Sequence, residues 1–526
     1  YRASLGYSDQ EGVMLGSGMT SANARMNINH TALDGKLKLS MNLNYGETNA
    51  DQAPVSNTVG SEMGSSMLYE AYVFNPTYPV YNDEGDFYDV PPYRVNPVSF
   101  ASEILDERKN RKFLGNLTAD WNFYKPFTFQ VNLGYTYNSI ERNSYISKSN
   151  LLGNGNGGYV SVQKLQDYSR LLETILKYNQ KFGKHSIDAM LGYSYQYFYD
   201  EGNHTRAYGF LSDTFKWYSL AAAKTVESIS SFAESNTLIS MYGRINYNYG
   251  DKYLFTATVR RDGSSRFGDN NKWGWFPAVS VGWRINKEKF LSNVKWIDDL
   301  KLRAGYGVTG NQDFSNYKSL MMMTTAGKFY YNGQWINTYQ PASNANPDLK
   351  WEKKAEFNVG IDMTMFDNRL SFTFDYYKRT TSNLLYDYIV PTPPYVYNTL
   401  FTNVGKVTNE GVELTISGTP FNTRDFTWNT SLTVSHNKNK LVKFTNDEFT
   451  NGTYKVGWST SAACYTQRLI EGQSLGTFYG PIWLGTDTDG KDVLLGQNAD
   501  GSVPEEQWEK IGCAYPDATL SWSNTF

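Results

Sequence analysis

Apolar and polar residues alternate one by one along much of the chain. In residues 37–45, leucine, methionine and tyrosine fill the odd positions, while lysine, serine and asparagine fill the even ones. Residues 127–137 and 357–365 repeat the pattern. Because successive side chains of a β-strand point to opposite faces, each segment predicts a strand with one apolar and one polar face.

The alternation predicts sixteen strands, several of them long. Sandwich strands usually have about 5–6 residues, whereas a tilted strand that crosses a membrane needs ~9–11. An ordinary antiparallel sandwich also alternates and is the alternative reading. The strands are expected at residues 1–8, 19–29, 36–46, 111–123, 127–138, 168–181, 185–199, 237–249, 253–261, 275–285, 300–309, 353–365, 369–379, 409–419, 424–437 and 519–526.

The connections between these strands are alternately short and long. Residues 33–35 and 366–368 are short turns, whereas residues 47–110 and 438–518 are long connections. The connection at 286–299 is of intermediate length and fits the rule less well. A sandwich does not require short and long connections to alternate. Outer-membrane barrels do show this alternation, because they have tight periplasmic turns and long extracellular loops. The sequence therefore predicts an all-β fold, a transmembrane antiparallel β-barrel.

The composition is consistent with a barrel. The mean hydropathy of −0.53 suggests a soluble protein, but an apolar lipid face and a polar interior average to a negative value. The 526 residues include 41 Tyr, 29 Phe and 13 Trp, and a barrel places such rings at the membrane interfaces. The net charge of −3 argues against nucleic-acid binding. No run approaches the ~18 apolar residues of a membrane helix.

Residues 261–268 read Arg-Asp-Gly-Ser-Ser-Arg-Phe-Gly, and residues 346–352 read Asn-Pro-Asp-Leu-Lys-Trp-Glu. These motifs resemble those of the SusC/RagA family of TonB-dependent outer-membrane transporters. We expect the motifs to be structural, with Arg266 paired to a carboxylate. A phosphate-binding loop is not expected, because a strand rather than a helix follows. The motif residues are Asp262, Gly263, Arg266, Phe267, Gly268, Trp273, Gly274, Pro277, Gly310, Asn311 and Gln312.

The resemblance implies an architecture and a function. Family members have a 22-stranded barrel filled by an N-terminal plug, so residues 1–526 are expected to be one partial barrel domain without the plug or the last strands. The implied location is the outer membrane of a Gram-negative bacterium. The implied function is active import of oligosaccharides or peptides, energised through TonB and assisted by a SusD-like surface lipoprotein that acts as a lid. The alternatives are a siderophore-type receptor, a passive porin and a surface-binding barrel.

Aromatic residues cluster in the long connections. Rings with polar tips suit a sugar, a peptide or a protein lid. The alternative is that these rings only pack the loops against one another. The residues expected to face a ligand or lid are Tyr81, Tyr88, Tyr330, Tyr331, Trp335, Tyr339, Tyr388, Tyr395 and Tyr397.

The sequence predicts neither an enzyme nor a cofactor or metal site. The four histidines are scattered and lack the spacing of zinc ligands. Residues 487–492, Asp-Thr-Asp-Gly-Lys-Asp, suggest calcium, but the glycine comes two positions early for an EF-hand loop, so an acidic turn is preferred. Cys464 and Cys513 could form one disulfide in an oxidising compartment or remain two free thiols.

Overall fold

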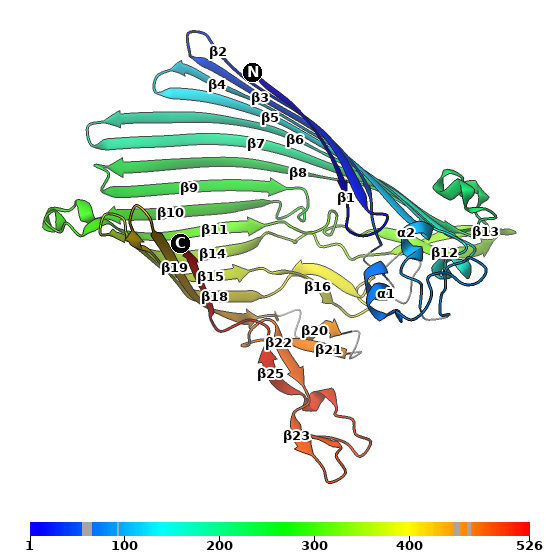
Figure 1. Ribbon diagram of the computed structural model, residues 1–526. Coiled ribbons are helices and arrows are strands. Elements are labelled where there is room, and N and C mark those ends of the chain that lie inside the picture. The colour runs from blue at the N-terminus through cyan, green and yellow to red at the C-terminus, as the bar shows by residue number, and fades with distance from the viewer. Residues whose placement is uncertain (55–65, 92–93, 446–452, 460–463) are drawn as a thin grey trace. The chain divides into compact units, whose positions relative to one another are not determined.

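A computed structural model describes residues 1–54, 66–91, 94–445, 453–459 and 464–526. Sixteen strands form one sheet, in which β1 to β11 follow one another in chain order and β14, β15, β18, β19 and β26 continue the series (Figure 1). Their bounds are β1 (Arg2–Glu11), β2 (Gly18–Ala32), β3 (Leu37–Asp51), β4 (Ile104–Tyr124), β5 (Phe127–Ile146), β6 (Tyr159–Phe182), β7 (His185–Tyr208), β8 (Thr225–Tyr249), β9 (Tyr253–Ser264), β10 (Trp273–Arg284), β11 (Ile297–Asn311), β14 (Glu352–Met365), β15 (Leu370–Ser382), β18 (Lys406–Asn422), β19 (Thr427–Lys443) and β26 (Thr519–Thr525).

The sixteen predicted strands are confirmed, because each predicted segment overlaps one strand of this sheet. Several predicted boundaries are wrong at the ends that lead into long connections. Strand β8 begins at Thr225 instead of residue 237, β6 begins at Tyr159 instead of 168, and β7 ends at Tyr208 instead of 199. In these extensions both faces carry polar residues, so the alternation that marks a strand in the sequence is lost.

The chain divides into two compact units, and the division runs through β6, β7 and β8. Unit 1 comprises Tyr1–Leu176 and Tyr193–Ile239, and unit 2 comprises Lys177–Gly192 and Ser240–Phe526. Within unit 1, β1 to β5 pair in antiparallel registers. Its helices are α1 (Met67–Val73), α2 (Ser99–Glu103), α3 (Leu151–Asn154), η1 (Asp213–Tyr218) and η2 (Leu220–Ala222).

The long connections of unit 1 form packed structure of their own. Phe100 is fully buried in a cluster with Met67 of α1 and Ile146 of β5. A second cluster surrounds Tyr145 and Trp217. The apolar residues of these connections therefore bury each other beside the ends of the strands.

Unit 2 carries small sheets in its long connections. Its 3₁₀ turns are η3 (Ile285–Lys287), η4 (Lys289–Leu291) and η5 (Glu505–Gln507). The hairpin of β12 (Met323–Tyr331) and β13 (Gln334–Pro341) lies between β11 and β14, and β16 (Leu385–Ile389) pairs with β17 (Thr399–Asn403) between β15 and β18. The connection before β26 holds β20 (Thr453–Ser459), β21 (Cys464–Ile470), β22 (Thr477–Gly480), β23 (Trp483–Thr486), β24 (Asp492–Leu494) and β25 (Glu509–Cys513).

The two faces of the unit 2 sheet differ in chemistry. The antiparallel registers place Ile361 of β14 beside Leu302 of β11 and Phe374 of β15. The next residue, Asp362, points to the other face and lies opposite Lys301 of β11. Because the registers keep like residues together across strands, the sheet has one apolar face and one polar face.

A short turn shows how the sequence closes the hairpins. Gly250 and Asp251, between β8 and β9, both have positive φ, at 59° and 55°. Two consecutive positive φ values characterise the type I′ turn, whose twist matches that of paired strands. Asp251 donates its backbone N–H to Oδ1 of Asn248 at 2.9 Å, which stabilises the turn. None of the helices in the described ranges has the length and apolar character to cross a bilayer.

Candidate functional site

Two of the sequence motifs meet in a buried aromatic cluster of unit 2. Phe267 is 1% exposed, and its ring centroid lies 4.6 Å from that of Trp351 and 5.3 Å from that of Phe314. Trp351 also contacts Phe276 at 5.2 Å and donates its indole N–H to the backbone carbonyl of Lys272 at 3.0 Å. These contacts join the β9–β10 connection to the segment before β14.

Gly268 brings two backbones into direct contact beside this cluster. A Cβ at this position would lie 2.1 Å from the carbonyl oxygen of Pro347, which is closer than real Cβ contacts allow. The Gly268 N–H donates to the carbonyl of Leu349 at 3.0 Å. The glycine is therefore required by the close approach of the backbones. The motif residues Gly263, Gly274 and Gly310 similarly face the rings of Trp273 and Phe276.

The prediction that Arg266 pairs with a carboxylate is wrong. Its guanidinium donates to Oδ1 of Asn316 at 2.9 Å and to the backbone carbonyl of Gln312 at 3.0 Å. The motif carboxylate, Asp262, instead accepts from Nε of Arg260 at 2.8 Å. Arg266 therefore binds the connection that follows β11 through one side-chain oxygen and one backbone carbonyl. The spacing of residues in the sequence does not reveal these contacts.

The remaining motif residues lie in the strands and their ends. Asn311 donates from its side chain to Oε1 of Glu352 at 3.2 Å, and thus joins the ends of β11 and β14. Pro277 lies in β10 opposite Val259. Trp273 is 42% exposed at the start of β10. We keep a structural role for these residues as a prediction.

The hairpin of β12 and β13 presents four of the expected aromatic residues to solvent. Tyr330 and Trp335 lie opposite each other, with ring centroids 5.2 Å apart, and are 56% and 67% exposed. Tyr331 and Tyr339 are 65% and 68% exposed. Their rings are available to a ligand or a partner.

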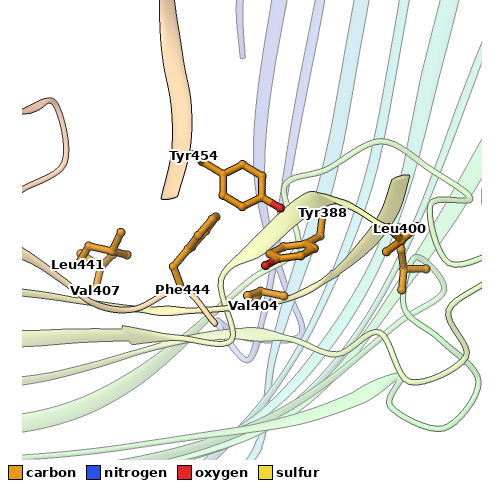
Figure 2. Close-up of a cluster of buried hydrophobic side chains, with 8 residues drawn as sticks. Tyr388, Leu400, Val404, Val407, Leu441, Phe444 and Tyr454 are labelled. Atoms are coloured by element: carbon orange, nitrogen blue, oxygen red, sulfur yellow. The ribbon is translucent and has the colours of Figure 1, made fainter. Parts of the chain in front are cut away.

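Tyr388 does not have the expected exposed position. It is 2% exposed, and its ring centroid lies 5.2 Å from that of Tyr454 and 6.2 Å from that of Phe444. Figure 2 shows these three rings together. For Tyr388 the packing alternative therefore holds, because burial among aromatic rings stabilises the loops and leaves no surface for a ligand. The other members of the cluster are Val390, Leu400, Val404, Val407 and Leu441.

The neighbours of Tyr388 differ in exposure. Tyr395 is partly buried against the same cluster, and Tyr397 is 38% exposed. Glu471 stabilises the loop beside the cluster, because its Oε1 accepts the backbone N–H of Phe444 at 2.7 Å and that of Thr445 at 3.0 Å. These hydrogen bonds, with that of Phe444 foremost, lower the pKa of Glu471 below its ordinary value.

In unit 1 the expected residues Tyr81 and Tyr88 belong to a small aromatic turn. Tyr81 is 54% exposed and packs on Phe87 with ring centroids 5.1 Å apart. Tyr88 is partly buried and lies 5.3 Å from the ring of Tyr78. Tyr81 thus offers more of its ring to a ligand than Tyr88.

Sequence analysis missed an ionic cluster on the polar face of unit 2. Arg303 of β11 donates from Nε to Asp362 at 3.0 Å and from Nη2 to Asp375 at 2.6 Å. Asn358 donates to Asp375 at 3.3 Å. A Cβ at Gly360 would lie 2.6 Å from the guanidinium carbon, so the glycine leaves room for the arginine. The signal that the sequence offered for this cluster is that its charged residues occupy the polar positions of alternating strands.

Two hollows open on the polar side of the strands near this cluster. One, of about 320 Å³, is lined by Lys301 and Arg303 and by the small residues Ser280, Gly282 and Gly305. Another, of about 340 Å³, includes Lys354 and Glu356 among its lining residues. Small side chains in β10 and β11 create this space between longer charged side chains.

The described residues form neither a cluster of metal ligands nor a disulfide. Within these ranges no group of three histidine, cysteine or carboxylate side chains could hold a metal ion. In the 487–492 turn, the Asp487 carboxylate accepts the backbone N–H groups of Asp489 and Lys491, both at 2.9 Å. Cys464 and Cys513 are both free thiols, so the disulfide alternative is not realised.

Comparison with known proteins identifies the fold. Residues 55–500 match the family model described as TonB dependent receptor-like, beta-barrel. The chain belongs to this TonB-dependent receptor family. The barrel is 30% identical to TonB-dependent receptor P3 of Formosa agariphila, over 100% of the chain and 54% of that relative. It is 28% identical to TonB-dependent receptor SusC of Bacteroides thetaiotaomicron, over 96% of the chain and 52% of SusC.

A solved structure confirms the predicted β-barrel. The structure of the RagAB peptide transporter superposes with a TM-score of 0.82 at 24% identity, over 99% of this chain and 58% of that one. The resemblance to SusC and RagA is thereby confirmed at the level of family and fold. The chain spans about half the length of the curated relatives that it matches.

Membership in this family shows which face of the sheet contacts lipid and which faces the lumen. Barrels of this family lie in the outer membrane, so the predicted location is confirmed. In such barrels the apolar side faces lipid and the polar side faces the lumen. The face with Ile361 and Phe374 is therefore the lipid side. Arg303, Asp362 and Asp375 accordingly lie on the lumenal side.

Replacing Asp375 with asparagine should lower the free energy of unfolding of the receptor by about 1.5–3 kcal/mol, the range for a hydrogen bond to a charged group. The Arg303 guanidinium would lose one of its two carboxylates. Urea unfolding in detergent would measure the change. The control is Asp375→Asn in an Arg303→Met background, where a smaller effect is expected. Equal effects in both backgrounds would contradict a direct interaction.

Proposed function

We propose that the full-length receptor actively imports oligosaccharides or peptides across the outer membrane. The observation that carries this proposal is the similarity to SusC and P3 over at least 96% of the chain. The RagAB structure, described as a peptide transporter, supports the peptide alternative through a shared fold. We propose further that residues 1–526 contribute to a single barrel domain and that TonB supplies the energy through a plug outside these residues.

We also propose a SusD-like surface lipoprotein as a lid. The β12–β13 hairpin supports this partner, because an isolated two-stranded hairpin is only marginally stable in water. Its strands pair with each other and with no other strand of the described chain. Phe329, Trp335 and Tyr339 are 57%, 67% and 68% exposed. Trp and Tyr are also the residues that most often dominate binding interfaces.

Import by the full-length protein should stop when the proton gradient is collapsed. Cells that carry the receptor as their single route for a labelled oligosaccharide or peptide would be measured with and without an uncoupler. Cells without the receptor are the control. Uptake that survives uncoupling would reject active transport and favour a passive porin. Uptake of an iron–siderophore complex without an associated lipoprotein would favour a siderophore-type receptor.

Replacing both Trp335 and Tyr339 with alanine should weaken binding of the lid lipoprotein or the ligand roughly tenfold or more, because each removes a large exposed ring. Affinity of the purified full-length receptor for the co-expressed lipoprotein and for a labelled ligand would be measured by titration. Phe290→Ala is a matched control, since Phe290 is 67% exposed but lies in η4, between β10 and β11, at the end of the sheet opposite the long connections. Unchanged affinities in the double variant would reject a binding role for the hairpin.

A further inference from the structure

The lipid side of unit 2 ends in a band of lysines. Along β15, the residues on this side are Leu370, Phe372 and Phe374, then Tyr376, and then Lys378. The same side of β19 carries Leu432 and Val434 before it reaches His436, Lys438 and Lys440. Thus lysines replace apolar residues on the same face of β15 and of β19, which are separated by β18, at the ends that lead into the long connections.

The strand registers bring these lysines together. Lys378 of β15 lies opposite Glu410 of β18, which lies opposite Lys438 of β19. Thr408, two residues before Glu410, lies opposite Lys440. Lys406 of β18 and Lys353 of β14 each lie opposite Ser382 of β15. We call Lys353, Lys378, Lys406, Lys438 and Lys440 the lysine band.

The band carries more positive charge than its own carboxylate can neutralise. Lys378 contacts Glu410, with Nζ and Oε2 3.3 Å apart, and Glu410 also accepts the hydroxyl of Tyr376 at 2.6 Å. With the residues that the structure describes, the other four lysines of the band form no ion pair. Lys406, Lys438 and Lys440 are exposed. Their ammonium groups are available to an external anion.

This charge excess is not a general property of the strand ends. In unit 1, the lipid side of β3 continues from Leu43 and Tyr45 to Glu47. Glu47 pairs with Lys109 at 2.9 Å and with Arg111 at 3.2 Å. There the neighbouring charges compensate each other within the protein, whereas the lysine band of unit 2 leaves positive charge unpaired.

We propose that the lysine band binds the phosphate-bearing headgroups of lipids in the outer leaflet. The band continues the lipid-facing surface directly, at the level where Tyr376 marks the membrane interface. Extracellular loops are the long ones in such barrels, so these strand ends lie in the outer leaflet. Lysine stems can lie along the apolar surface while the ammonium groups reach the phosphates. The inference rests on the outer-membrane location and is independent of the proposed import.

The favoured anion is a lipid rather than an acidic protein surface because of the direction in which the lysines point. They share their face with Phe357, Phe374 and Val434, which lie in the lipid-contacting part of the sheet. A lid placed over the barrel mouth would meet the loops first. Lipids that surround the barrel contact this face along its whole height.

The test uses full-length receptor purified in detergent, with lipid A as the probe and native mass spectrometry as the readout. Lys378→Gln, Lys438→Gln and Lys440→Gln together should weaken lipid A binding roughly tenfold or more, since each lysine near an anionic membrane surface contributes appreciably. Replacing the same three lysines with arginine should retain binding. The matched control, Lys295→Gln with Lys491→Gln and Lys510→Gln, removes the same number of exposed charges elsewhere and should bind normally.

Two further binding measurements, with dephosphorylated lipid A and with inorganic phosphate, identify the source of the phosphate. Dephosphorylated lipid A should bind the unchanged receptor as weakly as lipid A binds the glutamine variant, and inorganic phosphate alone should not bind measurably. Equal binding of both lipid A forms, tight binding of inorganic phosphate, or normal lipid binding by the glutamine variant would each overturn the proposal. If the glutamine variant failed to bind the lid lipoprotein but still bound lipid A normally, the band would be assigned to a protein interface instead. Heat-modifiable gel migration of each variant verifies that the barrel is folded.

Discussion

Replacing Trp351 with alanine is expected to lower the free energy of unfolding by about 3–5 kcal/mol, the range for large aromatic residues in cores. Trp351 is 4% exposed and contacts both Phe267 and Phe276. The substitution leaves a cavity between these rings and removes the hydrogen bond to Lys272. Reversible urea unfolding of the receptor in detergent would give the change.

Two variants separate the causes of this loss. Trp335→Ala makes the same chemical change at a site that is 67% exposed and should leave stability nearly unchanged. Trp351→Phe keeps much of the ring but removes the indole N–H, so it should cost less than the alanine variant. Similar losses for Trp351→Ala and Trp335→Ala would show that the cluster around Phe267 does not stabilise the barrel.

Gly268→Val should have an effect at least as large, with failure to form a heat-modifiable barrel as the expected extreme. The first added carbon would lie 2.1 Å from the carbonyl oxygen and 2.3 Å from the carbonyl carbon of Pro347. These are backbone atoms and cannot rotate away as a side chain would. Overpacking commonly costs about 1–3 kcal/mol and sometimes more, and a clash with backbone atoms on both sides is expected to exceed that range.

Gly155→Ala is the matched glycine control for Gly268. Nothing lies within 4 Å of a Cβ at Gly155, and its φ of −59° suits any L-residue. This variant should match or slightly exceed the stability of the unchanged receptor, because alanine restricts the unfolded chain. A stable, normally migrating Gly268→Val barrel would disprove the close backbone approach.

The membrane-spanning part of the fold could be predicted from the sequence because the physics there is local. A strand between lipid and lumen must alternate, and residues 357–365 in β14 do so without interruption. The prediction of sixteen strands succeeded for this reason. Beyond the membrane, strand residues meet water or other loops on both sides, and β8 begins with Thr-Val-Glu-Ser-Ile-Ser-Ser, which lacks a regular apolar face.

The loop sites were harder to predict because their environment depends on distant residues. Tyr388 has the local sequence of an exposed loop tyrosine, yet its burial comes from Phe444 and Tyr454, far along the chain. Trp335 has a comparable sequence context but no such cover in the described chain. Sequence alone therefore placed these aromatic residues in the long connections and did not separate packing residues from exposed ones.

The lumenal cluster was missed for a related reason. Asp362, Asp375 and Arg303 each occupy an ordinary polar position in an alternating strand. Their contact depends on the registers of β11, β14 and β15, which place Arg303 opposite Gly360 and Gly360 opposite Asp375. A register follows from strand pairing and not from the composition of any one strand.

The order of strands in the large sheet also has a consequence for how the barrel assembles. Each strand lies beside its neighbour in the chain, except where β12–β13, β16–β17 and β20–β25 intervene. Contacts between near neighbours close short loops, which costs little entropy and favours rapid folding. Hairpins can therefore join the growing sheet one after another as the chain emerges. The slow steps should be the junctions β3–β4, β11–β14, β15–β18 and β19–β26, because a long connection with folded structure of its own must form or move before the next strand can pair.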